Sequence, residues 1–285
     1  MSNNKIAVIG GDCRQAFLAA FLAESGYECA VFAIDGEDIG GAVRCGCLND
    51  AVTDASALVL PLPVSRDGVN LNAPLYSGKI PLDQIRAVVP DTTLITGGML
   101  KQSCFPNNKV CDYYAKEELQ LLNTIPTAEG AIAIAMEKLP TTLHGTKTLI
   151  MGFGRVGKTL ALMLKGLGAE VEVATRNTAE KAVCRILGFT VVEYGTLSDK
   201  VSDYGLIYNT VPALLLNDDL LCRVQNGTPV IDLATHPGGV DASAAVSRGK
   251  AVIWALGLPA KVAPITAGEY ISKTVLGILR EENIV

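Results

Sequence analysis

The feature that most constrains this chain is a glycine-rich turn between a short apolar run and a helix-like repeat. The apolar run at 149–151 predicts a buried parallel strand, and the sequence GFGRVG follows it at once over 152–157. Apolar residues then recur at helical spacing as far as Gly168, and the segment VEVA at 171–174 predicts a second strand. A strand, a GxGxxG turn, a helix and a second strand at this spacing are typical of a unit that binds a dinucleotide.

Each glycine of this turn has a different expected role. Gly152 permits the tight turn out of the strand, Gly154 lets backbone N–H groups approach a pyrophosphate, and Gly157 lets the helix pack closely on the strand. Arg155 and Val156 lie at the start of the helix, whose N–H groups and partial positive charge favour phosphate groups. The alternative is that the glycines serve only a tight turn in an α/β unit that holds no ligand.

The residues after the second strand indicate which dinucleotide is bound. A site for NAD usually carries Asp or Glu there, which bonds the ribose 2′-hydroxyl. In this chain Arg176 holds that position, between Thr175 and Asn177. A guanidinium can pair with a 2′-phosphate, and hydrogen bonds to charged groups contribute about 1.5–3 kcal/mol. The sequence therefore predicts NADP as the cofactor, and the alternative is a solvated Arg176 with use of NAD as well.

Composition argues against several classes of function. A chain of 285 residues suits two domains, and a net charge of −5 without a basic block argues against nucleic-acid binding. No apolar run reaches the roughly eighteen residues of a membrane span, and the first residues lack the pattern of a signal peptide. The eight cysteines are scattered and only two histidines occur, so we expect a cytoplasmic protein without a metal site.

A second strand–glycine–helix–strand unit begins the chain. The segment 5–10 predicts a strand, GGDCRQ leads into a helix that runs to about Ser25, and 28–33 predicts the next strand. This turn lacks the GxGxxG spacing, and Asp12 at the start of the helix would repel a phosphate. Asp12 is therefore expected either to contact a substrate or to serve only as the N-cap of the helix.

The order of predicted elements indicates an α/β fold with two Rossmann-like, doubly wound parallel-sheet domains joined by crossing helices. The first domain is expected at 1–122, completed by a C-terminal helix within 267–285, and binds the substrate. The second is expected at 123–266, binds NADP and includes a linking helix at 126–138.

Donor groups follow two further predicted strands of the first domain. These strands end in PLPVSRDG and in Gly97-Gly98. Because ligands of open α/β sheets lie beyond the carboxyl ends of the strands, we expect Arg14, Ser65, Arg66 and the two glycine amides to converge on a small carboxylate. The alternative for Arg66 is an ordinary turn, since Asp and Gly follow it.

In the second domain, the strand predicted at 205–208 is followed by Asn209, Thr210, Val211 and Pro212. Asn209 and the amides of this segment are expected to face the nicotinamide half of the cofactor at the switch point of the sheet. The strand predicted at 230–233 leads into ATHPGGVD.

The domain order and the GFGRVG turn resemble the D-2-hydroxyacid dehydrogenases. Ile265 stands where those enzymes keep a catalytic His, which argues against a lactate-type mechanism. The chain resembles the family of the larger subunit of dipicolinate synthase more closely and over nearly its full length. The motifs that carry this resemblance are GGDCRQ, PLPVSRDG, TGG, IPTAEGAIAIAME, GFGRVG, NTVPA and DLATHPGG.

The resemblance implies an oxidoreductase of the spore-forming branch of lysine biosynthesis. A dihydrodipicolinate-type ring would pass hydride to NADP and become pyridine-2,6-dicarboxylate, and the smaller, flavoprotein-like subunit of dipicolinate synthase would be the partner in a homo- or hetero-oligomer. Thr235 stands where the family usually has Ser, and is expected to lie at the cofactor. His236 is a candidate base or a solvated turn residue, and Glu129 is a second candidate base or a partner of the helix dipole.

Two other functions remain open at this point. The segment NTVP suggests a shikimate-dehydrogenase-like reductase, but the first domain offers no obvious Lys–Asp pair for that chemistry. The chain could also be a non-catalytic NADP-binding subunit that organises a flavoprotein partner. A donor-rich first domain favours the catalytic interpretation, because a scaffold does not need such donors.

Overall fold

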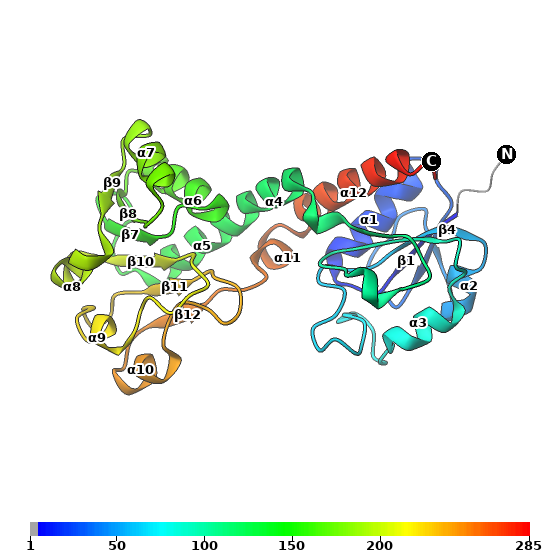
Figure 1. Cartoon of the computed structure of the whole chain (residues 1–285), viewed down its shortest axis with the longest axis horizontal. Coiled ribbons are helices and arrows are strands. Elements are labelled where there is room, and N and C mark those ends of the chain that lie inside the picture. The colour runs from blue at the N-terminus through cyan, green and yellow to red at the C-terminus, as the bar shows by residue number, and fades with distance from the viewer. Residues whose placement is uncertain (1–4) are drawn as a thin grey trace. The chain divides into compact units, whose positions relative to one another are not determined.

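The computed structural model describes residues 5–285, which divide into two compact units. Unit 1 extends to Asn123 and resumes with Ala263–Val285, and unit 2 spans Thr124–Val262. Each unit contains one six-stranded parallel sheet flanked by helices (Figure 1). The predicted fold class, two α/β units with doubly wound parallel sheets, is confirmed.

The sheet of unit 1 has the strand order β3-β2-β1-β4-β5-β6, and all its pairs are parallel. Its strands are β1 (Lys5–Ile9), β2 (Cys29–Phe32), β3 (Val43–Arg44), β4 (Ala55–Val59), β5 (Leu94–Gly97) and β6 (Val110–Asp112). The order reverses between β1 and β4, so the crevice expected of an open α/β sheet lies beyond the carboxyl ends of these two strands.

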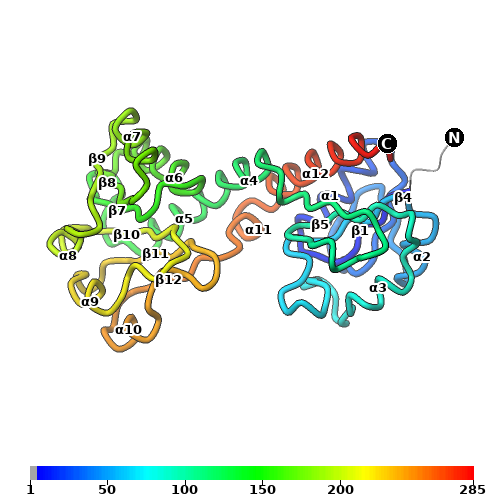
Figure 2. Tube along the Cα trace, viewed as in Figure 1, coloured from blue at the N-terminus to red at the C-terminus, as the bar shows by residue number. Residues whose placement is uncertain are grey.

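Helices cover both faces of the unit 1 sheet (Figure 1). They are α1 (Cys13–Glu24), α2 (Leu48–Val52), α3 (Leu82–Val88), α4 (Glu117–Leu122) and α12 (Pro264–Glu281). Apolar residues of α1, α4 and α12 form one core with β1, and residues of α2 and α3 form a second core. Figure 2 shows the path of the backbone, with α12 and α3 on opposite sides of the sheet. A Cβ atom on Gly268 would lie 3.0 Å from the Arg14 backbone oxygen, so this glycine lets α12 approach α1 closely.

The sheet of unit 2 has the order β12-β11-β10-β7-β8-β9 and is parallel throughout. Its strands are β7 (Lys147–Met151), β8 (Glu170–Ala174), β9 (Thr190–Val192), β10 (Leu206–Asn209), β11 (Val230–Asp232) and β12 (Val252–Trp254). The register pairs Asn209 with both Met151 and Asp232, so the carboxyl ends of β7, β10 and β11 are aligned at the switch point.

Two layers of helices enclose the unit 2 sheet. They are α5 (Thr124–Lys138), α6 (Arg155–Gly166), α7 (Thr178–Ile186), α8 (Leu197–Lys200), α9 (Asp218–Leu221), α10 (Ala242–Ser247) and α11 (Leu258–Val262). One core joins α5, α6 and α7 to alternate sheet residues, and a second core joins α8, α9 and α10 to the residues between them. This alternation is why the buried strands of unit 2 read as nearly continuous apolar runs.

Both units also contain short 3₁₀ helices. The 3₁₀ helices are Gln102–Cys104, Tyr113–Ala115, Tyr194–Thr196 and Val201–Asp203. Helix α5 begins at Thr124, two residues before the predicted start, because a proline is tolerated in the first turn of a helix. None of the helices within 5–285 combines the length and apolarity that crossing a membrane requires.

Candidate functional site

The glycine turn after β7 is built from two close backbone contacts. Gly152 has φ +95°, and a Cβ atom on it would lie 2.5 Å from the Thr210 hydroxyl oxygen. A Cβ atom on Gly157 would lie 2.4 Å from the backbone oxygen of Gly152. Any side chain at either position would therefore push α6 or the segment after β10 away from the strand.

Gly154 borders open space, in contrast to the other two glycines. It is the exposed N-cap residue of α6, and a Cβ atom there would meet nothing within 4 Å. The helix begins without a side-chain cap at this residue, and the next two residues are the exposed Arg155 and the half-buried Val156. A helix start that carries no capping side chain and faces open space fits the pyrophosphate of a dinucleotide.

The polar side chains on either side of Arg176 are bonded within the protein. Thr175 is buried, and its hydroxyl donates to the Glu180 carboxylate. The Asn177 side-chain oxygen accepts from the amides of Ala179 and Glu180 at 2.9 and 3.3 Å, so Asn177 caps α7. These bonds do not favour the predicted contact of the two side chains with the cofactor, which stays a prediction.

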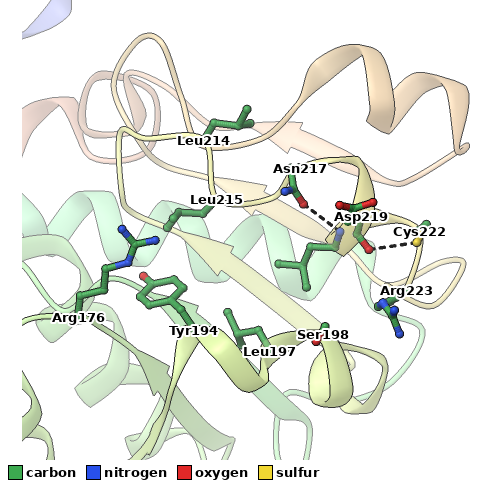
Figure 3. A pocket seen from close by; sticks show the side chains of 11 residues that line it. Arg176, Tyr194, Leu197, Ser198, Leu214, Leu215, Asn217, Asp219, Cys222 and Arg223 are labelled. Atoms are coloured by element: carbon green, nitrogen blue, oxygen red, sulfur yellow. Dashed lines mark hydrogen bonds between the residues drawn. The ribbon is translucent and has the colours of Figure 1, made fainter.

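Arg176 has the exposure that an anion-binding residue needs. Its guanidinium carbon lies 5.0 Å from the centroid of the Tyr194 ring. Beside it opens a cavity of about 460 Å³ within unit 2 (Figure 3). The cavity has apolar walls from leucines and a polar end, and its lining residues are Arg176, Tyr194, Leu197, Ser198, Leu214, Leu215, Asn217, Asp219, Leu220, Cys222 and Arg223. Its size and mixed lining suit the adenosine end of a dinucleotide.

Asn209 and Asp232 tie together the loops after β10 and β11. Both are fully buried, and the Asn209 side-chain nitrogen donates to Asp232 Oδ1 at 2.8 Å. Asp232 also accepts from the amides of Ala234 and Gly239, each at 3.0 Å. The amide group of Asn209 bonds to Asp232 and to the backbone of Val211, which does not favour the predicted contact of this side chain with the nicotinamide. That contact stays a prediction.

The rest of the segment after β10 closes over the glycine turn. The Thr210 amide and hydroxyl both donate to the Met151 backbone oxygen at 2.9 Å. Val211 is half-buried beside Gly152, and Pro212 is exposed. Thr210 therefore fixes the position of this segment, while Val211 and Pro212 form its outer part.

Thr235 and His236 are exposed on the turn after β11. The Gly238 amide donates to the Thr235 backbone oxygen at 2.8 Å, which closes the turn. Asp232 accepts hydrogen bonds from Ala234 and Gly239, one at each end of this loop. These bonds fix the backbone that carries the Thr235 and His236 side chains.

In unit 1, Asp12 and Arg14 form an ion pair at the start of α1. Asp12 is the N-cap residue, and both its oxygens accept from the Arg14 guanidinium at 2.8 Å. Burial opposes the charged form of Arg14, but the hydrogen bonds and charge of Asp12 outweigh it, so the pKa of Arg14 is raised. Arg14 also donates to the Leu62 backbone oxygen at 2.7 Å and is only 9% exposed. Arg14 is thus already satisfied by the protein.

The PLPVSRDG segment forms a tightly bonded turn. The Ser65 hydroxyl donates to the Asn70 backbone oxygen at 2.6 Å, and Asp67 accepts from the amides of Val69 and Asn70. Hydrogen bonds from Asn70 and Val69 hold the pKa of Asp67 below its ordinary value. This geometry does not favour the predicted contact of Ser65 with the substrate, because the Ser65 hydroxyl donates within the turn. The contact stays a prediction.

Arg66 is exposed, and the same loop links it to the other predicted donors. Its Nε donates to the Asn72 side-chain oxygen at 3.2 Å, and the Asn72 side chain donates to the Pro63 backbone oxygen at 3.1 Å. The Gly98 amide donates to the Pro61 backbone oxygen at 3.0 Å and is therefore not available to a carboxylate. The structure brings Arg14, Arg66 and Gly98 to one loop, and of these three Arg66 is the exposed side chain.

Glu129 is exposed in the second turn of α5 rather than at its start. The first turn of α5 contains no acidic residue, so the expected pairing of Glu129 with the helix dipole is wrong. The cysteines within 5–285 are all free thiols, and no cluster of three candidate metal ligands occurs in that part of the chain.

Two family models match successive parts of the chain. Residues 5–123 match the N-terminal domain of the dipicolinate synthase subunit DpaA. Residues 127–233 match the NAD binding domain of D-isomer specific 2-hydroxyacid dehydrogenases. The second match covers the glycine turn, Arg176 and the segment after β10, and it indicates a nicotinamide cofactor.

Three comparisons with individual proteins extend over both units. The corresponding dipicolinate synthase subunit of Bacillus subtilis (strain 168) is 29% identical over 288 aligned residues, which cover 97% of this chain and 96% of that protein. The chain is similar to this subunit of dipicolinate synthase along nearly its whole length. The crystal structure of the same subunit from Bacillus halodurans aligns with a TM-score of 0.88 and 26% identity over 98% of each chain. The crystal structure of the Bacillus subtilis protein aligns with a TM-score of 0.86 and 29% identity, over 99% of this chain and 97% of that one.

The resemblance to the larger dipicolinate synthase subunit predicted from the motifs is thereby confirmed. The dehydrogenase-type domain and these relatives support an oxidoreductase that uses a nicotinamide cofactor. Sequence reasoning passed over several residues that shape the site, among them Asp232, Tyr194 and Glu180. Asp232 lies inside DLATHPGG and ends an apolar strand, which is a signal for a buried polar anchor, whereas Tyr194 and Glu180 carry no such signal.

Proposed function

We propose that this protein catalyses the NADP-dependent oxidation of a dihydrodipicolinate-type ring of the lysine pathway to dipicolinate, pyridine-2,6-dicarboxylate. The observation that carries the proposal is the similarity to a dipicolinate synthase subunit across both units, at 97% coverage of the chain. The open space at Gly154 and the cavity beside Arg176 support dinucleotide binding by unit 2. We further propose that the protein works in the cytoplasm during sporulation, with the smaller, flavoprotein-like subunit of the synthase as its partner.

The residues of the chain position the reactants rather than supply the driving force. A nicotinamide held by unit 2 would supply the hydride acceptor, and the aromaticity of the product would favour the oxidation. A dicarboxylate needs cationic donors, and Arg66 offers an exposed guanidinium that Asn72 holds in place. Asp12 holds the buried Arg14 guanidinium, which in turn donates to the Leu62 backbone oxygen and fixes that loop.

One proton must leave the ring, and two exposed groups of unit 2 are candidates to accept it. His236 stands on the turn that Asp232 anchors, and histidine exchanges protons near neutral pH. Glu129 in the second turn of α5 is the other candidate. Replacing the responsible base should lower kcat far more than it weakens NADP binding.

The reaction is tested with the purified chain, the lysine-pathway intermediate and NADP, by following NADPH absorbance and dipicolinate formation. We expect product from the chain alone or with its flavoprotein-like partner, and loss of product with Arg66→Ala through a raised KM. Tight NADP binding without product under either condition would instead identify a non-catalytic subunit that organises its partner. Absence of dinucleotide binding would overturn the proposal.

The preference for NADP is tested separately at Arg176. Its exposed guanidinium can pair with a 2′-phosphate, so Arg176→Asp should weaken NADP binding by about 10- to 100-fold and NAD binding much less. Arg185→Asp is the matched control, since Arg185 is an exposed arginine in the last turn of α7. Equal weakening of NADP and NAD by Arg176→Asp would remove the reason for the preference.

A further inference from the structure

A cluster of three side chains surrounds the carboxyl end of β8. Tyr194 follows β9, Arg176 follows β8, and Glu180 lies in the first turn of α7. In Figure 3 the Arg176 guanidinium lies over the Tyr194 ring at one end of the cavity. The cluster combines one cation, one anion and one aromatic ring at the position that decides between NAD and NADP.

The Tyr194 side chain contacts the backbone of β8 through its hydroxyl and the Arg176 guanidinium through its ring. Its hydroxyl donates to the Ala174 backbone oxygen at 3.1 Å, which ties the ring to the last residue of β8. The ring lies 5.0 Å from the Arg176 guanidinium carbon, within the range of a cation–π contact. Burial raises the pKa of Tyr194, the Arg176 charge lowers it and the Glu180 charge raises it, so both charges act on the phenol.

Glu180 places a negative charge beside the same strand end. Its carboxylate accepts from the buried Thr175 hydroxyl, one residue before Arg176. Glu180 is half-buried, and the carboxylate is thus near the ribose end of the proposed cofactor site. A carboxylate there suits a ribose 2′-hydroxyl and opposes a 2′-phosphate.

We propose that Tyr194 and Glu180 set the cofactor preference of this protein through Arg176: the Tyr194 ring positions the guanidinium for a 2′-phosphate, and the Glu180 carboxylate limits that preference so that NAD is also accepted. The inference rests on the proposed function, since it concerns the same dinucleotide site. It assigns the preference for NADP over NAD to Arg176, Tyr194 and Glu180 together rather than to Arg176 alone. Tyr194 acts as a positioning residue, because its contact is with Arg176.

The test measures binding by the full chain without turnover. NADPH and NADH are titrated by their fluorescence, and 2′,5′-ADP and 5′-AMP are used as competitors that differ in the 2′-phosphate. Tyr194→Leu removes the ring and should weaken NADPH and 2′,5′-ADP by about two- to fivefold, with NADH little changed. Tyr194→Phe keeps the ring and should therefore retain most of the NADPH affinity of the unaltered chain.

The opposite sign is expected at Glu180. Glu180→Gln keeps the shape and the acceptor for Thr175 but removes the charge, so NADPH affinity should rise by about two- to fivefold relative to NADH. Glu170→Gln is the matched control, because Glu170 is exposed at the amino end of β8. Added salt should reduce the effect of Glu180→Gln and leave that of Tyr194→Leu nearly unchanged.

The outcomes separate this inference from the function on which it rests. If the unaltered chain binds no dinucleotide, the proposed function fails. If it binds dinucleotides but Glu180→Gln and Tyr194→Leu leave the ratio of NADPH to NADH affinity unchanged, only the inference is overturned. Should Tyr194→Leu fail to fold by circular dichroism, Glu180→Gln decides the matter, since a ratio of NADPH to NADH affinity that stays unchanged or falls with Glu180→Gln contradicts the proposal.

Discussion

At the scale of single residues, the Asp232 carboxylate determines the shape of two loops of unit 2. It accepts three hydrogen bonds while fully buried, from the Asn209 side chain and from the amides of Ala234 and Gly239. A buried donor that loses its acceptor costs about 1–3 kcal/mol. The loops that follow β10 and β11 therefore depend on one side chain.

Asp232→Ala should lower the free energy of unfolding by about 2–4 kcal/mol, because three buried donors lose their acceptor. Urea unfolding of the full chain measures the loss. Asp199→Ala is the control, since Asp199 is exposed on α8 and should change stability by less than about 0.5 kcal/mol. Equal effects of the two substitutions would show that Asp232 does not anchor the loops.

Position 157 requires glycine because of a single close contact with the backbone of Gly152. Gly157→Ala would place a Cβ atom 2.4 Å from the Gly152 backbone oxygen and should weaken NADPH binding at least about tenfold. Gly166→Ala, at the other end of α6, meets nothing within 4 Å and should leave binding unchanged while stabilising the helix slightly. NADPH fluorescence titration of both variants makes the comparison.

Sequence reasoning at this scale located the glycine turn but did not foresee the internal hydrogen bonds of several polar side chains, and the cofactor contact of Arg176 stays a prediction. Gly152 and Gly157 have the tight turn and the close packing that their spacing predicts, because a Cβ atom at either position would clash with its neighbours. Asn209 and Ser65 are different, because residue type does not reveal whether a polar group points to solvent or to its own loop. That choice depends on neighbours distant in the sequence.

At the scale of elements, the pairing of α1 with α12 depends on one small residue. A Cβ atom on Gly268 would lie 2.9 Å from Phe17 Cβ and 3.0 Å from the Arg14 backbone oxygen. Gly268→Ala should therefore separate the two helices and lower the free energy of unfolding by about 1–3 kcal/mol.

Gly277→Ala is the matched control in the same helix. A Cβ atom on Gly277 meets nothing within 4 Å, so this change should be neutral or slightly stabilising. Thermal unfolding followed by circular dichroism compares the variants. A loss with Gly277→Ala as large as that with Gly268→Ala would contradict the close-packing argument.

The central strands of both sheets were predictable, whereas the edge strands β3, β6 and β9 were not. Strands such as β1, β7 and β10 are fully enclosed and give apolar runs within a residue or two of their observed bounds. The edge strands β3, β6 and β9 have two or three residues and little burial, so they lack a periodic signal. The early start of α5 was missed because its helical residues precede a proline.

At the scale of the whole molecule, buried acids make stability sensitive to alkaline pH. Burial raises the pKa of the Cys29 thiol from 9.0 to about 12, and burial also raises the pKa of Tyr113 and Tyr208. The pKa of Tyr204 is also raised, mainly by burial and further by the nearby Glu172 carboxylate. The folded state thus keeps protons that the unfolded state loses.

The resulting pH dependence has a definite sign. The contribution of these groups to stability is complete below pH 9, and it falls as the pH rises from 9 to about 12, because only the unfolded state ionises in that range. Urea unfolding at pH 8 and pH 10.5 should show the decrease. Tyr204→Phe should make it shallower, and a stability that rises over this interval would contradict the argument.

The division of unit 1 into two chain segments has a consequence for biosynthesis. Residues up to Asn123 emerge from the ribosome first, yet the face of α1 that α12 covers stays bare until the segment after Ala263 has been translated. Unit 2 is continuous in sequence and has all its strands once Trp254 is made. The nucleotide-binding half can therefore fold during synthesis, whereas the amino-terminal half, although made first, is completed last.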